Sequence, residues 1–172
     1  MATPEITPAA ADGRIDAGIT RGEQPGPGVR RVLLRRVRVG VQLAQHHPLA
    51  EHQEVGTADA AGYPLRLPDR AANSVVHDQL AALFRDARPH PRFHTPAVAF
   101  DMSQRDLRDG ITLAPAGEAA AEVQPDGLTW RPLRGAPGLT IHLVLPRERS
   151  PLHRRVLAVA EALAHELDWL SD

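Results

Sequence analysis

An alternating run of apolar residues constrains the fold of this chain more than any other feature. Val37, Val39, Val41 and Leu43 occupy every second position, which indicates a strand with one buried face. Ser150 and Pro151 open the longest amphipathic stretch, and Asn73 and Ser74 precede another with helical spacing. Further strands are expected at residues 15–20, 29–34, 64–67, 92–100, 110–115, 128–133 and 139–146, with short helices at 103–108 and 117–123. Strands alternating with helices predict an α/β fold with mixed sheets.

Composition excludes several classes of function. The 172 residues include no cysteine, and all 20 basic residues are arginine. Without cysteine there is no thiolate nucleophile or disulfide, and without lysine there is neither a P-loop nor a pyridoxal Schiff base. The net charge of −1 gives no support for direct DNA binding by this chain. Because the chain has no run of 18 apolar residues and no secretory signal pattern, we expect no membrane association and a cytoplasmic location.

Three histidines, His46, His47 and His52, form the densest group of potential metal ligands in the sequence. His46 and His47 are adjacent, so their side chains diverge on an extended chain, and Pro48 prevents a helix that would bring His52 beside them. We therefore predict a solvated loop and no metal site. No Gly-x-Ser-x-Gly or His-Glu-x-x-His motif occurs. The sequence thus predicts no catalytic residues, no cofactor and no enzyme.

The order of several short sequence words resembles one regulatory family. "GRIDAGITRG", "RVGVQLAQHHPLA", "YPLRLPDR", "DGITLAP" and "GLTIHLVLPRERSPLHRRVLAVAEAL" follow one another from Gly13 onward. "HPLA" after an alternating strand and "LPRERSP" before a long helix are the most specific of them. Together they resemble the C-terminal effector-binding domain of LysR-type transcriptional regulators, over residues 13–167.

This resemblance implies an α/β, two-lobed fold of the type 2 periplasmic-binding-protein kind, with an incomplete first lobe. Residues 13–38 and 116–172 would form the first lobe and residues 39–115 the second, joined near Val37–Val41 and Leu113–Pro115. Residues 1–12 are rich in Ala, Pro and Thr, and we expect a disordered or loose N-terminus. Compared with the family, the chain begins late, without the helix-turn-helix, and has only Gly110 where a Gly-x-Gly pair is usual.

Seven residues are candidates for ligand binding. A strand, a short loop and a helix start at residues 64–75 predict an anion site, to which Asn73 and Ser74 would donate hydrogen bonds and Arg70 charge. Simple helix capping beside a surface arginine is the alternative. By the resemblance, Asp101, Met102 and Ser103 match a ligand-binding loop of the second lobe, and Arg21 matches the loop after "DAGI".

The leading hypothesis is a non-catalytic module that binds a small, anionic effector between two lobes and does not bind DNA alone. Effector binding would favour one arrangement of the lobes over another. A second hypothesis is an interaction module that forms a homodimer, or a heterodimer with a full-length relative, through surface left exposed by the incomplete lobe. The third hypothesis is a small hydrolase.

Overall fold

The chain forms two compact units. The computed structural model describes residues 3–22, 26–94, 100–148 and 150–170, without the side chains of residues 3 and 100–103. Unit 1 comprises Met1–Val37, Arg70–Val76 and Leu139–Asp172, and unit 2 comprises Arg38–Asp69 and His77–Gly138. Among the helices of the described ranges, none combines the length and apolar character needed to cross a bilayer.

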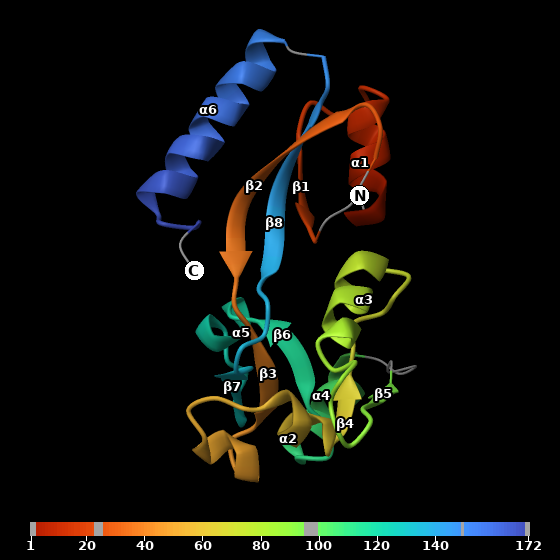
Figure 1. Cartoon of the computed structure of the whole chain (residues 1–172), viewed down its shortest axis with the longest axis vertical. Coiled ribbons are helices and arrows are strands. Elements are labelled where there is room, and N and C mark those ends of the chain that lie inside the picture. The colour runs from red at the N-terminus through yellow and green to blue at the C-terminus, as the bar shows by residue number, and fades with distance from the viewer. Residues whose placement is uncertain (1–2, 23–25, 95–99, 149, 171–172) are drawn as a thin grey trace. The chain divides into compact units, whose positions relative to one another are not determined.

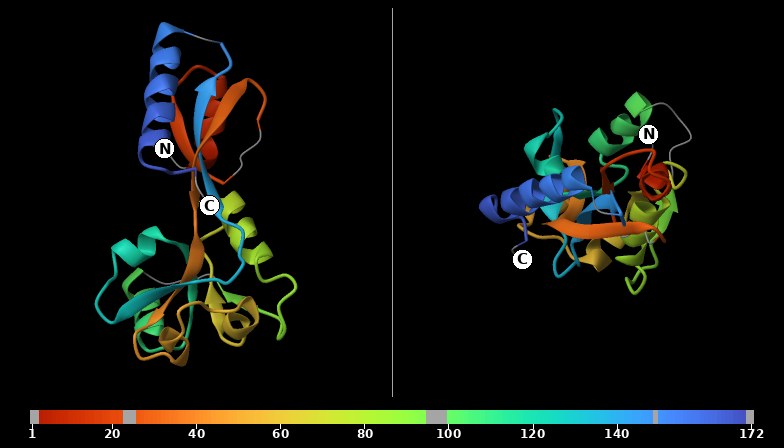
Figure 2. Two further views of the ribbon diagram at one scale, coloured as in Figure 1. Left: turned by 60° about the vertical axis from the view of Figure 1, so that its left-hand side comes forward. Right: turned by 90° about the horizontal axis from the view of Figure 1, so that it is seen from above.

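Unit 1 is built on an antiparallel sheet with strand order β1-β8-β2. Its strands are β1 (Gly18–Arg21), β2 (Val29–Val37) and β8 (Leu139–Pro146), and helices α1 (Thr3–Ala11) and α6 (Pro151–Glu166) cover opposite faces (Figures 1 and 2). Leu34, Leu143 and Leu145 form a buried cluster against which Val156, Leu157 and Ala160 of α6 pack. Period-two strands thus bury one face under a helix whose apolar residues repeat every three or four positions.

Helix α1 occupies a segment where no regular structure was expected, so the expectation of a loose end is wrong for residues 3–11. Pro8 disfavours a helix, because a proline in the helix interior lacks the N–H donor, whereas Pro4 lies in the first turn, where proline is tolerated. Packing compensates for this, since Ala9 and Ala10 are completely buried and α1 contacts β1 and β8. Tertiary contacts override local propensity here.

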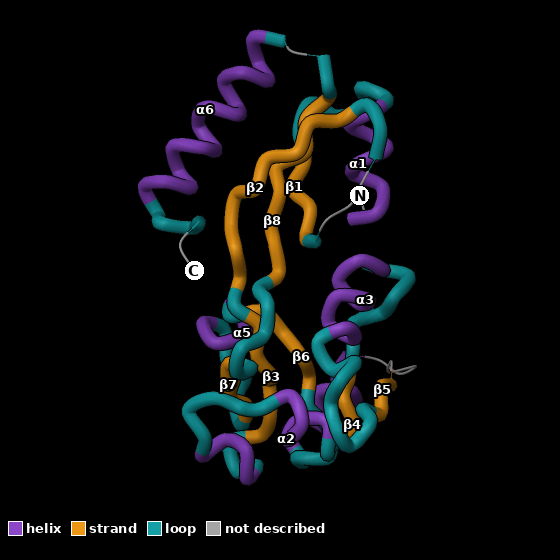
Figure 3. Tube along the Cα trace, viewed as in Figure 1, coloured by secondary structure: helices purple, strands orange, loops and turns teal. Residues whose placement is uncertain are grey.

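Unit 2 contains an antiparallel sheet with strand order β6-β3-β7. Its strands are β3 (Val39–Ala44), β6 (Ala114–Gly117) and β7 (Leu128–Pro132), and a parallel pair is formed by β4 (Pro64–Arg66) and β5 (Arg92–His94) (Figure 3). The remaining helices are η1 (Pro48–Glu51), α2 (Thr57–Ala61), α3 (Ser74–Ala82), α4 (Phe100–Arg108) and α5 (Ala119–Glu122). The first residues of α3, through Val76, group with unit 1.

The division between units differs from the expected lobes in one large segment. The chain passes from unit 1 to unit 2 at Val37–Arg38, but residues 116–138 group with unit 2 and the return occurs at Gly138–Leu139. The physical reason is strand pairing, because β6 and β7 both hydrogen-bond to β3. The alternating run from Val37 to Leu43 also divides at Arg38, which separates β2 from β3.

Gly40 lies in the central strand of the three-stranded sheet of unit 2, between β6 and β7. It pairs with Ala116 of β6 and with Pro132 of β7. The indole of Trp130 passes over Gly40, and its Nε1 donates to the carbonyl oxygen of Ala116 at 3.2 Å. A Cβ at position 40 would overlap this indole and the carbonyl oxygen of Arg131. Glycine is required here because of close approach.

Candidate functional site

The connection from β4 to α3 carries three of the predicted ligand residues. Strand β4 ends at Arg66, and α3 begins at Ser74. The side-chain oxygen of Asn73 accepts a hydrogen bond from the N–H of Val76 at 3.1 Å. Asn73 therefore caps α3, as its position before the helix predicted. The cap engages the amide oxygen and leaves the side-chain NH₂ group, a potential donor, outside this bond.

The electrostatics at the start of α3 favour a negative ligand. The first helical turn contains no acidic residue, so no side-chain charge there compensates the positive end of the helix dipole. Ser74 is half-buried and Arg70 is exposed. A helix start that carries a hydroxyl group, with an arginine four positions earlier in the chain, offers the types of donor that bind a carboxylate or a phosphate.

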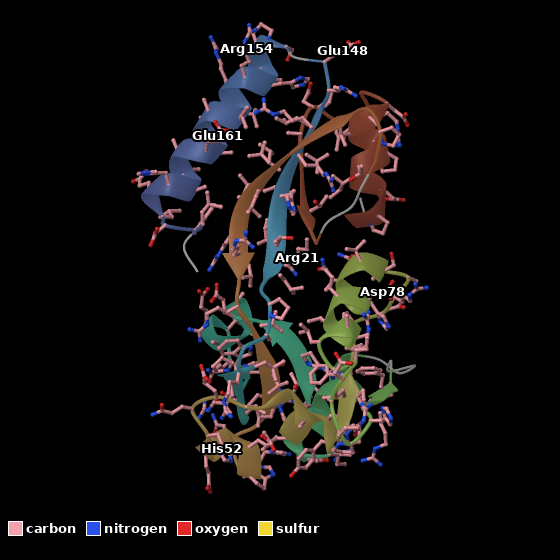
Figure 4. All side chains as sticks on the ribbon, viewed as in Figure 1. Arg21, His52, Asp78, Glu148, Arg154 and Glu161 are labelled. Carbon is pink, nitrogen blue, oxygen red and sulfur yellow. The ribbon has the colours of Figure 1, made fainter. Side chains whose placement is uncertain are left out.

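Arg21 is the last residue of β1 and is exposed at the end of the sheet of unit 1 (Figure 4). It pairs with Ile141 of β8 through the strand ladder. Residues 70–76 belong to the same unit. Four of the predicted ligand residues are therefore found in unit 1, namely Arg21, Arg70, Asn73 and Ser74. The last three lie close together in the chain, within residues 70–74.

The other three predicted ligand residues occupy a helix. The backbone of Asp101, Met102 and Ser103 belongs to α4, rather than to a loop after a strand. Their side chains lie outside the described residues. The stretch expected to be a strand over residues 92–100 is a strand at β5, and residues 95–99 also lie outside the described part.

Arg66 is a charged residue that the sequence did not single out. Its backbone N–H donates to the carbonyl oxygen of Leu113 at 2.7 Å, and its side chain is half-buried. Burial lowers the pKa of the Arg66 guanidinium, and the negative charge of Asp106 opposes that shift. The sequence signal that could have identified Arg66 is the motif "LRL". Side chains alternate between the two faces of a strand, so this arginine lies on the face opposite to that of the two leucines.

The three histidines of residues 46–52 differ in burial and do not converge on one point. His47 is buried, whereas His46 and His52 are exposed. The Nδ1 atom of His47 accepts a hydrogen bond from the N–H of Leu49 at 3.1 Å and so caps η1. Within the described ranges, no group of three histidine, aspartate or glutamate side chains is placed to hold a metal ion.

A cavity of about 160 Å³ lies in unit 1 beside α6. Arg30, Leu145 and Pro146 line it from β2 and β8, and the helix contributes His153, Arg154, Leu157, Ala158 and Glu161. None of the predicted ligand residues lines this cavity, and pockets for small molecules usually measure about 300–1,000 Å³. It is therefore distinct from the candidate site at α3.

A family model and several solved structures match the chain. The model described as "LysR substrate binding domain" matches residues 1–168. The structure of the BenM effector binding domain with its effector benzoate has a TM-score of 0.83 at 20% identity, covering 100% of this chain and 79% of that one. No curated protein sequence matches the chain.

Two full-length proteins show the same fold at lower identity. CbnR, solved in complex with its target DNA, has a TM-score of 0.81 at 17% identity, covering 95% of this chain and 58% of that one. OxyR C199D from Pseudomonas aeruginosa has a TM-score of 0.75 at 15% identity, covering 95% and 56%. The chain thus spans a little over half the length of these two proteins.

Proposed function

Because the chain belongs to the LysR substrate-binding domain family, whose model covers residues 1–168, we propose that it binds a small anionic effector. The family is a non-enzymatic one of transcriptional regulators, so binding rather than catalysis is the function to test. The proposal that the effector is anionic rests on the electrostatics at the start of α3. There, Asn73 caps a helix whose first turn has no acidic residue.

The proposed contacts follow from the chemistry of these residues. The hydroxyl group of Ser74 and the NH₂ group of Asn73 donate to the effector carboxylate, and the guanidinium of Arg70 adds positive charge. Arg21 and the residues Asp101, Met102 and Ser103 are proposed as additional contacts. An anionic head group with an apolar body suits such a site, and benzoate, the effector in the BenM structure, is a suitable first probe.

Thermal unfolding in the presence of mono- and dicarboxylates tests the proposal. A bound effector stabilises the folded chain in a saturable manner, by about 2.7 kcal/mol at a hundredfold excess over Kd. Sodium chloride at the same ionic strength controls for general salt effects, and phosphate is screened as a second class of anion. If neither a carboxylate nor phosphate gives saturable stabilisation, the proposed anion site is contradicted.

Variants at the helix start locate the site. Arg70→Ala and Ser74→Ala should weaken binding of the effector that the screen identifies, because each removes a donor to a charged group, worth about 1.5–3 kcal/mol. Arg85→Ala is the matched control, since Arg85 is also exposed but belongs to the segment after α3. Equal affinity in all three variants would move the site away from α3.

DNA binding is a separate question for this chain. Its net charge is −1, and proteins that bind DNA through phosphates concentrate positive charge. We propose that the chain by itself retains no operator DNA. A band-shift experiment at low salt with promoter fragments tests this, and specific retention would contradict it.

Association with another protein subunit is the second candidate function. It is favoured by large apolar side chains exposed along α6 and beyond its end, of which Val159 is 59% exposed. Such a surface suits a homodimer, or a heterodimer with a full-length relative. Light scattering of the purified chain tests the homodimer directly, and a monomer at all concentrations argues against it.

A further inference from the structure

The cavity beside α6 has an apolar floor. The floor is formed at the end of β8 and on one face of the helix, by Leu145, Pro146, Leu157 and Ala158. A cavity of about 150 Å³ lined by apolar side chains is large enough for benzene. The cavity of about 160 Å³ in unit 1 therefore has room for one branched or aromatic hydrocarbon group, and for no larger apolar body.

Charged side chains surround this floor. Arg30 of β2 pairs with Leu145 of β8 in the antiparallel register, so these two side chains lie on the same face of the sheet. Arg154 and Glu161 come from α6 (Figure 4) and are about 10.5 Å apart along the helix axis. Leu157 lies between them in the chain. The cavity thus combines positive charge from two elements with one negative charge and an apolar floor.

These charges are available to a ligand. In the described part of the chain, the side chains of Arg30, Arg154 and Glu161 form no hydrogen bond and no ion pair. Arg30 is half-buried, whereas Arg154 and Glu161 are exposed, so the cavity is open to solvent on the side of the helix. A ligand that carries both signs of charge can reach all three groups without displacing an internal partner.

His153 forms a fixed wall of the same cavity. Its Nδ1 lies 3.0 Å from the carbonyl oxygen of Glu148, and its Nε2 lies 3.5 Å from a carboxylate oxygen of Asp16. The His153 side chain is only 12% exposed. Because both ring nitrogens are held in this way, the wall is in place before a ligand arrives. Binding to such a preformed site costs less ordering of the protein.

We propose that this cavity binds a free α-amino acid with an apolar side chain, such as phenylalanine or leucine. The apolar side chain of the ligand occupies the floor. Its carboxylate accepts hydrogen bonds from Arg30 and Arg154, and its ammonium group donates to Glu161. A simple carboxylic acid would place a second negative charge beside Glu161 without compensation. The cavity shares no residue with the start of α3, so this site is separate from the proposed effector site.

A series of three ligands tests the requirement for both charges. Phenylalanine carries both charges, phenylpropionate lacks the ammonium group, and phenethylamine lacks the carboxylate. For a ligand of about twelve non-hydrogen atoms we expect a Kd of about 1 mM, which an NMR titration of the isotope-labelled chain measures. Each analogue should bind at least about tenfold more weakly than phenylalanine. If phenylpropionate binds as tightly as phenylalanine, the site is one for anions only and the proposal is overturned.

Variants at the charged positions assign the contacts. Glu161→Gln should weaken the binding of phenylalanine about tenfold, because it removes the charge that attracts the ammonium group, and should not weaken the binding of phenylpropionate. Arg30→Gln should weaken both ligands. Arg31→Gln is the matched control, because Arg31 is the next residue of β2 and alternation directs it to the opposite face of the sheet. The control should bind phenylalanine like the parent chain.

Filling the cavity tests its location. Ala158→Leu places a larger side chain in the floor and should abolish binding of phenylalanine. Ala162→Leu adds the same group one turn further along α6, outside the lining, and should leave binding unchanged. Both positions are exposed, and leucine is a good helix former, so circular dichroism should show intact helices in both variants. Normal binding by Ala158→Leu would overturn the proposal.

The start of α3 provides the last comparison. Arg70→Ala should bind phenylalanine like the parent chain, because Arg70 does not line the cavity. If Arg70→Ala abolishes this binding and Ala158→Leu does not, the amino acid occupies the effector site and the proposal is overturned. Absence of saturable binding by both phenylalanine and leucine would also overturn it. That result would leave the proposed effector site intact, since carboxylates test the effector site separately.

Discussion

The imidazole of His47 meets the phenol ring of Tyr63 edge-on, with ring centroids 4.4 Å apart and ring planes inclined by 67°. His47 is only 3% exposed. Its Nδ1 accepts from the N–H of Leu49, so the ring is neutral with its proton on Nε2. Burial lowers the pKa of His47, and the charge of His46 lowers it further. Protonation at Nδ1 would also break the cap of η1.

The first prediction concerns acid. Because the pKa of His47 is lower in the folded chain than in the unfolded chain, the unfolded chain takes up the proton first. The contribution of neutral His47 is complete above the unfolded pKa of about 6.5 and is lost as pH falls through the folded pKa. His47→Asn retains an oxygen that can cap η1 and does not titrate. Its free energy of unfolding, measured in urea, should therefore depend less on pH than that of the parent chain.

His52→Asn is the control for this experiment, because His52 is exposed and also lies at the boundary of η1. It should retain the pH dependence of the parent chain. Parallel pH profiles for the parent chain and His47→Asn would contradict the assigned role of His47.

The second prediction concerns the cap of α3. Asn73→Ala removes the oxygen that accepts from Val76 and should lower the free energy of unfolding by about 1 kcal/mol. Asn73→Asp retains an acceptor at the same position and should lose little stability. Denaturation in urea distinguishes the two, and equal losses in both variants would mean that the cap is not the source of the effect.

The third prediction concerns the close approach of strands in unit 2. Gly40→Ala should destabilise the chain by about 1–3 kcal/mol or more, because the new methyl group would overlap the carbonyl oxygen of Arg131. Replacement of Trp130 by alanine in the same chain should not rescue it, since the backbone obstruction remains. Thermal unfolding of the single and double variants measures this. Rescue would show that the indole alone requires the glycine.

The fourth prediction concerns Arg131. Its Nε and Nη2 both donate to the carbonyl oxygen of Ala50, at 3.0 and 2.8 Å, and its Nη1 donates to the hydroxyl group of Thr129 at 2.9 Å. Arg131→Lys keeps the charge but cannot reproduce this fork, so we expect a loss of about 1–2 kcal/mol in the free energy of unfolding. Arg134→Lys, at an exposed position on the same segment, should change stability little. Equal losses would contradict the prediction.

Local patterns in the sequence identified the elements that have strong local signals. Ser150 and Pro151 begin α6 as predicted, and the hydroxyl group of Ser150 accepts from the N–H of His153. The α/β class and the family follow from the same patterns and are confirmed by the family model. Helix α1 could not be predicted, because it depends on the packing of Ala9 and Ala10 against the rest of unit 1 and not on a local sequence signal.

The candidate site was harder to predict from the sequence than the fold was. The capping role of Asn73 is a local property, and the structure shows it. The environment of Arg66 depends on Leu113 and Asp106, which are more than 35 positions away in the chain. Likewise, the burial of His47 depends on Tyr63, and spacing alone could not distinguish a buried cap from a solvated loop. Contacts between distant segments leave no periodic pattern in the sequence.

The position of β2 at the edge of its sheet has a consequence for the colloidal behaviour of the protein. This nine-residue strand contains Arg30, Arg31, Arg35 and Arg36. Two molecules that approached through these edges would bring eight guanidinium groups together, which disfavours the growth of a continuous sheet between molecules. Salt screens this repulsion, with a Debye length of about 3 Å at 1 M. Concentrated solutions should therefore remain clear longest at low ionic strength.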